Sequence, residues 1–149
     1  MNMKNLVVLI LVLFVSTVSF SQKKKITVEG DTIKVDGTSF LIVEKGKEDY
    51  SRVYRVKSLS GKILMKWHSK IFCETTPVNS KHNTCTEYFL VTFFPNTEQC
   101  DISIKPHNIK GIVVCILENN LVNDDKLYQA AVEEFVGING MGYTYKSME

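Results

Sequence analysis

Residues 86–94, TEYFLVTFF, decide the fold of this chain, because they are almost continuously apolar and rich in aromatic and β-branched side chains. This composition favours a β-strand, and a continuous apolar run bounded by turn signals is typical of a buried one. Turn-forming sequence stands on both sides of the stretch. We therefore predict that it is the central strand of an antiparallel sheet.

The sequence before this stretch divides into short segments of alternating polarity that are separated by turn residues. Such alternation predicts strands with one buried face. A polar loop is expected at residues 45–49, and a two-residue turn is expected at Ser60-Gly61. The predicted strands are, in order, residues 26–29, 32–35, 40–44, 51–57 and 62–72.

Antiparallel partners have residue numbers that sum to a constant, so each turn predicts which side chains share a face. A turn at Ser60-Gly61 and a pairing of Cys73 with Cys85 place one consistent set of side chains on one face. All of them are apolar except Glu87, which we expect at a strand end in water. The predicted pairs are Tyr54 with Trp67, Val56 with Met65, Trp67 with Val91, Met65 with Phe93 and Ile71 with Glu87.

A turn at Asn96-Thr97 continues the same face into one more strand, with Cys100 opposite Phe93 and Ile102 opposite Val91. The opposite face of the sheet carries polar and basic side chains, which is typical of a sheet face that meets solvent. Its predicted members are Arg55, Lys57, Lys66, His68, Lys70, Tyr88, Leu90 and Thr92.

After the last strand the apolar period changes to that of an amphipathic helix. Asn119-Asn120 predicts the end of this helix. Asn123 is expected to cap a second helix that carries Asp124-Asp125 in its first turn and ends at Gly137. The tail beyond it shows no periodicity and is expected to cross the surface. The apolar stripe of the first helix consists of Ile109, Ile112, Val113, Ile116 and Leu117.

The sequence therefore predicts an α+β fold, an antiparallel meander of about five to seven strands with two C-terminal helices packed on one face. Residues 22–149 fit a single domain, because a chain of this length buries one sizeable core.

Residues 1–21 have the pattern of a secretory signal peptide. Lys4 precedes a run of ten apolar residues at 6–15, and small residues stand at Ser19 and Ser21. The run is shorter than the roughly 20 apolar residues of a membrane span, so an uncleaved anchor is the weaker alternative. We expect cleavage near Ser21 and a mature chain without a membrane span, in the periplasm or outside the cell.

All four cysteines follow this segment, and an even number of cysteines in an exported chain favours disulfides. Cys73 and Cys85 flank a polar loop and stand opposite each other in the predicted register, so we expect them to be bonded. A second disulfide is expected between Cys100 and Cys115, with two buried free thiols as the alternative.

Four motifs make the chain similar to small uncharacterised exported proteins of Bacteroidota-type bacteria. They are the signal ending VSFSQ, the opening GDTIKVDG, the strand YFLVTFF and the closing AAVEEFVGINGMGY. The resemblance covers most of the chain. The resemblance implies that the protein is located outside the cytoplasm, and it implies no activity, cofactor or site residue.

The side chains that have the chemistry of zinc ligands are His68, Cys73, His82 and Cys85. Their spacing lacks the paired ligands of a zinc site, so a disulfide and two surface histidines are favoured over a metal. His68 or His82 beside Glu74 or Glu87 has the chemistry of a general base, but no nucleophile motif accompanies the pair. We expect no cofactor.

Residues 51–72 contain six basic residues and no acid, whereas residues 118–134 contain five acids and one lysine. This polarity predicts a face that binds an anionic envelope component or an acidic protein, with Tyr88 as a stacking platform. A solvated sheet face is the plain alternative, and export argues against nucleic acid as a partner. The candidate binding residues are Arg55, Lys57, Lys66, His68, Lys70 and Tyr88.

The expected function is that of an exported binding or interaction domain without enzymatic activity. One alternative is a small envelope enzyme, which a convergent pocket would favour. Another is an inhibitor of a foreign enzyme, which a protruding rigid loop would favour. The segment between Cys73 and Cys85 is the only candidate for such a loop.

Overall fold

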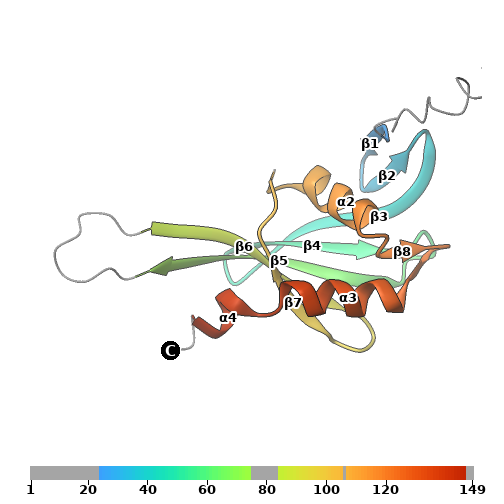
Figure 1. Cartoon of the computed structure of the whole chain (residues 1–149). Helices are drawn as coiled ribbons and strands as arrows, with labels where there is room; N and C mark the ends of the chain where they lie inside the picture. Colours follow the sequence, from blue (N-terminus) through green and yellow to red (C-terminus); the bar gives the residue numbers. More distant parts are fainter. Residues whose placement is uncertain (1–23, 75–83, 106, 147–149) are drawn as a thin grey trace, which may run out of the picture.

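The computed structural model describes residues 24–74, 84–105 and 107–146, and the predicted signal peptide lies outside these ranges. One antiparallel sheet holds seven strands in the order β1-β2-β3-β4-β5-β6-β7, so each strand pairs with its neighbours in sequence (Figure 1). Together with the helices, this sheet confirms the predicted α+β meander. The strands are β1 (Ile26–Glu29), β2 (Thr32–Val35), β3 (Thr38–Glu48), β4 (Ser51–Lys57), β5 (Ile63–Glu74), β6 (Thr84–Phe93) and β7 (Gln99–Ile102).

The third strand is longer than predicted, because the expected loop at residues 45–49 is strand as far as Glu48. The turn that follows consists of Asp49 and Tyr50, which both have positive φ, at 47° and 63°. Two residues in this conformation give a hairpin turn whose twist matches the paired strands. A polar sequence therefore continues the pairing of β3 with β4 instead of leaving the sheet.

The predicted register of β4, β5 and β6 is confirmed: Trp67 lies opposite Tyr54 on one side and Val91 on the other. Cys73 lies opposite Cys85. The stretch at residues 86–94 falls in β6, but β6 is next to the last strand in the sheet, so it is not the central one.

The register between β6 and β7 differs from the prediction by two residues, since Cys100 lies opposite Val91 and Ile102 opposite Phe89. The amide of Phe93 donates to the carbonyl oxygen of Glu98 at 2.9 Å, which centres the turn one residue earlier than expected. A shift of two residues leaves every side chain on its predicted face.

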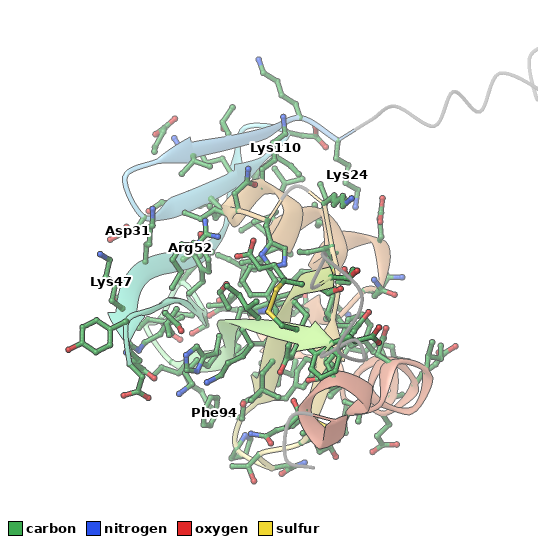
Figure 2. All side chains as sticks on the ribbon, turned by 90° about the vertical axis from the view of Figure 1, so that its left-hand side faces the viewer. Lys24, Asp31, Lys47, Arg52, Phe94 and Lys110 are labelled. Atoms are coloured by element: carbon green, nitrogen blue, oxygen red, sulfur yellow. A yellow bond between two sulfur atoms is a disulfide. The ribbon has the colours of Figure 1, made fainter. Side chains whose placement is uncertain are left out.

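Two helices, α2 (Ile109–Glu118) and α3 (Gln129–Asn139), cover one face of the sheet, and Figure 2 shows them on one side of it. The Phe135 ring of α3 meets the Phe93 ring of β6 edge to face at 6.1 Å. Trp67 is completely buried beneath the helices. We call this the covered face and the opposite one the polar face. No helix in the described ranges is long and apolar enough to cross a membrane.

The second of these helices begins later than predicted. Instead of capping it, Asn123 lies in a small hairpin of β8 (Val122–Asn123) and β9 (Lys126–Leu127). Asp124 and Asp125 form the turn of this hairpin with φ of 48° and 62°, a conformation that aspartate tolerates better than most residues. The helix runs past the predicted stop at Gly137 and ends at Gly140.

The C-terminal tail was expected to cross the surface with no periodic pattern, and the structure adds a short helix that is attached to the sheet. Residues of the short helix α4 (Gly142–Lys146) dock on the polar face. The Thr144 amide and hydroxyl donate to the buried Asp101 carboxylate at 2.8 and 2.7 Å. The Asp101 amide donates to the Gly140 carbonyl oxygen at 2.7 Å, so the link from α3 to α4 also covers the outer edge of β7.

Candidate functional site

The predicted basic face is largely neutralised by acids that come from β3. The Glu48 carboxylate pairs with Arg55 and, at 3.0 Å, with Lys66, while Glu44 pairs with Lys57. The hydrogen bond from Lys66 holds the pKa of Glu48 below its usual range, with help from Arg55 and against the effect of desolvation. The sequence window that looked basic contained no acid because the acids belong to the neighbouring strand.

His68 and Tyr88, two further candidates on this face, are buried, with relative exposures of 7% and 3%. The ring of Tyr143 in α4 stacks on Tyr88 at 5.0 Å, so Tyr88 is not an open stacking platform. Desolvation lowers the pKa of His68, and the charges of Lys70 and Lys66 lower it further. Lys70 is half-buried. The six candidate residues therefore share a face, but they do not form an exposed cationic surface.

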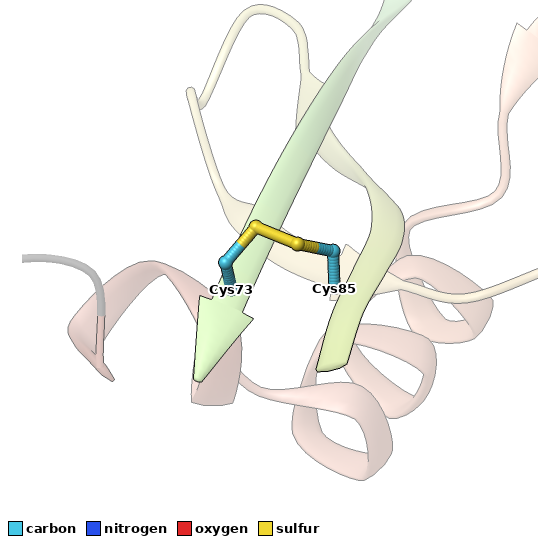
Figure 3. Close-up of a disulfide and its surroundings, with 2 residues drawn as sticks. All are labelled: Cys73 and Cys85. Carbon is cyan, nitrogen blue, oxygen red and sulfur yellow. A yellow bond between two sulfur atoms is a disulfide. The ribbon is translucent and has the colours of Figure 1, made fainter. Parts of the chain in front are cut away.

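The first predicted disulfide is present. Cys73 and Cys85 are bonded across β5 and β6 with their Cα atoms 4.0 Å apart (Figure 3). The disulfide joins the two strands of the hairpin at a point where both cysteines are exposed to solvent.

The second predicted disulfide is wrong, because Cys100 and Cys115 are buried free thiols. Cys100 lies in the core under the helices, whereas the sulfur of Cys115 lies 3.7 Å from the side-chain nitrogen of Asn119. Burial raises the pKa of Cys100 to about 12 and that of Cys115 to about 11, so both stay protonated at neutral pH.

Of the two histidines considered as a general base, His68 does not meet Glu87. His68 lies opposite Leu90 on the polar face, whereas Glu87 lies opposite Ile71 on the covered face. His82 lies outside the described residues. In the described ranges, no group of three or more His, Cys, Asp or Glu side chains could hold a metal ion.

The most distinctive feature of the molecule is the outer end of the β5–β6 hairpin, residues 71–74 and 84–87, which we call the hairpin arm. It extends past α2 and α3 on the left of Figure 1. The pairing of β7 with β6 ends at Ile102 opposite Phe89, and β4 pairs with β5 no further than Val53 opposite His68. The arm therefore consists of two strands alone, held together near the tip by the disulfide.

A polar cluster fixes the base of the arm. Oε1 of Glu87 lies 2.5 Å from Arg52 Nη2 and 2.8 Å from Ser69 Oγ, both of which donate to it. Nδ1 of His107, from the segment before α2, lies 3.0 Å from the same oxygen. Glu87 was expected alone in water at a strand end, and the structure instead joins it to three other segments of the chain.

The charge of Glu87 is stabilised in this cluster. Partial burial by itself would raise the pKa of Glu87, but the hydrogen bonds from Ser69 and Arg52 and the nearby His107 outweigh it and lower the pKa. Ser69 donates directly to a carboxylate, which leaves its hydroxyl without the histidine base that activates a serine nucleophile. The arrangement braces the arm and does not create a nucleophile.

Sequence reasoning missed His107 and Arg52 as partners of Glu87. The His107 ring also stacks on Phe89 with centroids 4.0 Å apart and planes 12° apart, which anchors the start of α2 to the base of the arm. Arg52 carried a usable signal, because the confirmed register of β4 and β5 already put it near Glu87 on the covered face. His107 carried none, since it follows the last strand and no turn fixes its position.

One large apolar side chain of the arm is open to solvent. Ile71 is 68% exposed on the covered face, directly opposite Glu87 and two residues from Cys73. On the other side of the arm the Phe72 ring lies 6.1 Å from Tyr143 of α4. The arm thus presents an exposed apolar side chain. The disulfide, the contacts of Glu87 and the contact of Phe72 with α4 hold the arm in place.

Comparison of the chain with protein-family models, with curated proteins and with solved structures finds no match.

Proposed function

We propose that this protein is an exported interaction domain without a catalytic role, and that the hairpin arm contacts its partner. The observation that carries the proposal is the projection of a disulfide-closed, two-stranded arm with Ile71 exposed beside the bond. A fixed element loses little conformational entropy when it binds, so a small contact area gives useful affinity. An exposed apolar side chain on such an element is a natural centre for a contact.

The arm is the stronger candidate when it is compared with the polar face. On the polar face, Arg55, Lys57 and Lys66 already have carboxylate partners within the chain, so an anionic ligand would have to compete with Glu44 and Glu48. On the arm, the Ile71 side chain is exposed, so a partner can contact it without displacing another group of the chain. We therefore favour a partner protein over an anionic envelope component.

Export supports this proposal and is tested separately. A disulfide such as that of Cys73 and Cys85 persists in oxidising compartments, which is consistent with the periplasm or the cell exterior. We expect mass spectrometry of the mature chain to find its amino terminus next to Ser21. A chain that still begins at Met1 would contradict cleavage.

The arm itself is tested with two matched substitutions in one strand. Ile71→Arg should abolish capture of the partner from envelope extract, because it places a charge in the apolar contact. Ile63→Arg changes another exposed isoleucine of β5, which lies at the opposite end of the strand and is 40% exposed, and it should leave capture intact. Equal capture by the two variants, with equal thermal stability, would show that the arm is not the contact.

An inhibitor of a foreign enzyme is the second candidate, and the same rigid projection favours it, since inhibitors insert preorganised elements into enzyme clefts. In that case the captured partner is an enzyme, and the protein should suppress its turnover. Ile71→Arg should remove the inhibition. If the captured enzyme keeps its turnover, the protein is not its inhibitor, and the proposal of an interaction domain stands.

A further inference from the structure

A groove lies between α2 and the C-terminal half of α3. Its larger part has a volume of about 360 Å³, reaches the end of β7 and is lined by both helices. A smaller part of about 190 Å³ adjoins it. The two parts share Glu118, Asn119, Phe135 and Ile138. We call them together the interhelical groove.

The floor and one wall of the groove are apolar. Phe135 and Cys115 are almost fully buried, whereas Ile138 is 76% exposed, the most open of the large aliphatic side chains described. Val114 completes this surface and is half-buried. An aliphatic stem laid along the groove would therefore remove apolar surface from water.

The rim of the groove presents hydrogen-bond acceptors. The side-chain nitrogen of Asn119 donates to the carbonyl oxygen of Cys115 at 2.8 Å, and that of Asn139 donates to the carbonyl oxygen of Phe135 at 2.7 Å. The amide oxygen of each side chain keeps its lone pairs available as an acceptor, and the amide nitrogen of Asn139 also keeps one N–H for a ligand. The carboxylates of Glu118 and Glu134 line the same groove.

The helix ends add to this negative character. Both α2 and α3 finish at the groove, and neither has a basic residue in its last turn. The C-terminal end of a helix carries a partial negative charge that such residues normally offset. Lys105 is the one basic residue that lines the groove, against two carboxylates and two helix ends.

From this geometry we infer that the interhelical groove binds a lysine or arginine side chain of a partner protein, in a segment where an aliphatic residue adjoins the basic one. The cationic head meets Glu118, Glu134 and the amide oxygen of Asn119 in the smaller part of the groove, and the methylene stem lies on Phe135 and Ile138. Charge complementarity selects this occupant over an acidic segment. The inference goes beyond the proposed function, since the groove does not include the hairpin arm.

The test uses the full mature protein and a short acetylated, amidated peptide of alternating lysine and leucine. Titration followed by NMR should shift the methyl signals of Val114 and Ile138 and the side-chain amide signals of Asn119 and Asn139. Glu118→Gln combined with Glu134→Gln should raise the dissociation constant at least about tenfold, because it removes both charge-assisted contacts. Glu133→Gln, an exposed neighbour outside the groove, is the matched control and should leave the dissociation constant unchanged.

Three results would overturn the inference. The first is equal binding of a peptide in which glutamate replaces lysine. The second is equal weakening by Glu133→Gln, which would indicate attraction by overall charge. The third is loss of peptide binding in Ile71→Arg, which would place the peptide on the hairpin arm. Normal peptide binding by Ile71→Arg is expected, and it keeps this test separate from that of the proposed function.

Discussion

The two faces of the sheet differ in how their side chains are accommodated, and two neighbouring residues of β5 show the contrast. Trp67 is completely buried on the covered face, with the Phe89 ring 5.6 Å away in an edge-to-face contact. Lys66, the residue before it, points to the polar face and pairs with Glu48. Apolar burial supplies most of the folding free energy, whereas half-exposed ion pairs contribute little. The covered face should therefore stabilise the fold, and the polar face should mainly keep it soluble and in register.

The largest expected effect tests this contrast directly. Trp67→Ala should lower the free energy of unfolding by about 3 to 5 kcal/mol, because it leaves a cavity in the core. Lys66→Ala should lower it by no more than about 1 kcal/mol. Urea unfolding measures both. Similar small losses for the two variants would mean that the faces have been assigned wrongly.

The outer end of the hairpin arm has no other described strand beside it, so its order should depend strongly on the disulfide. Replacing Cys73 and Cys85 together by serine should cost about 3 kcal/mol if the chain-entropy account of disulfides holds. Urea unfolding with and without reductant checks this expectation. Reductant should destabilise the wild type by the same amount and leave the double variant unchanged. A variant as stable as the wild type would show that the covered face alone orders the chain.

The polar face has one strongly buried interaction, which sharpens the contrast. Asp101→Ala should cost about 2 kcal/mol, because it removes two hydrogen bonds to a buried carboxylate. It should also speed amide hydrogen exchange at Tyr143 and Thr144, since α4 loses its attachment. Asp31→Ala, at an exposed turn, is the control and should change neither quantity. Unchanged exchange in Asp101→Ala would show that aromatic stacking alone holds α4.

The smallest expected effect is a dependence on pH at His68. Desolvation and the nearby Lys70 and Lys66 lower its pKa in the folded state, so folding favours the neutral ring. The stability that this provides is present above the unfolded pKa of about 6.5 and is lost as the pH falls from there toward the folded pKa. His68→Leu should therefore lose less stability than the wild type between about pH 7.5 and pH 5, as measured by urea midpoints. Equal losses would place His68 in contact with water.

Local chemistry in the sequence was enough to determine most of the sheet. The turn at Ser60-Gly61, together with alternation along each strand, predicted that Trp67 would face Tyr54, and the structure confirmed it. The expected pairing of Cys73 with Cys85 set the register of the next two strands, which the structure also confirmed. These predictions succeeded because register depends on residues that are close in sequence or joined by one tight turn. Even the register error at β7 kept the predicted faces.

Only the tertiary structure decided which charges are satisfied and where the chain ends dock. Glu48 neutralises a basic window that lies in other strands, His107 reaches Glu87 from a segment after the sheet, and Thr144 returns to Asp101 from the tail. Such contacts join segments far apart in sequence through side chains whose partners no local period specifies. The same reason explains why the interhelical groove could not be foreseen, since it forms from the ends of two helices whose relative placement the packing alone sets.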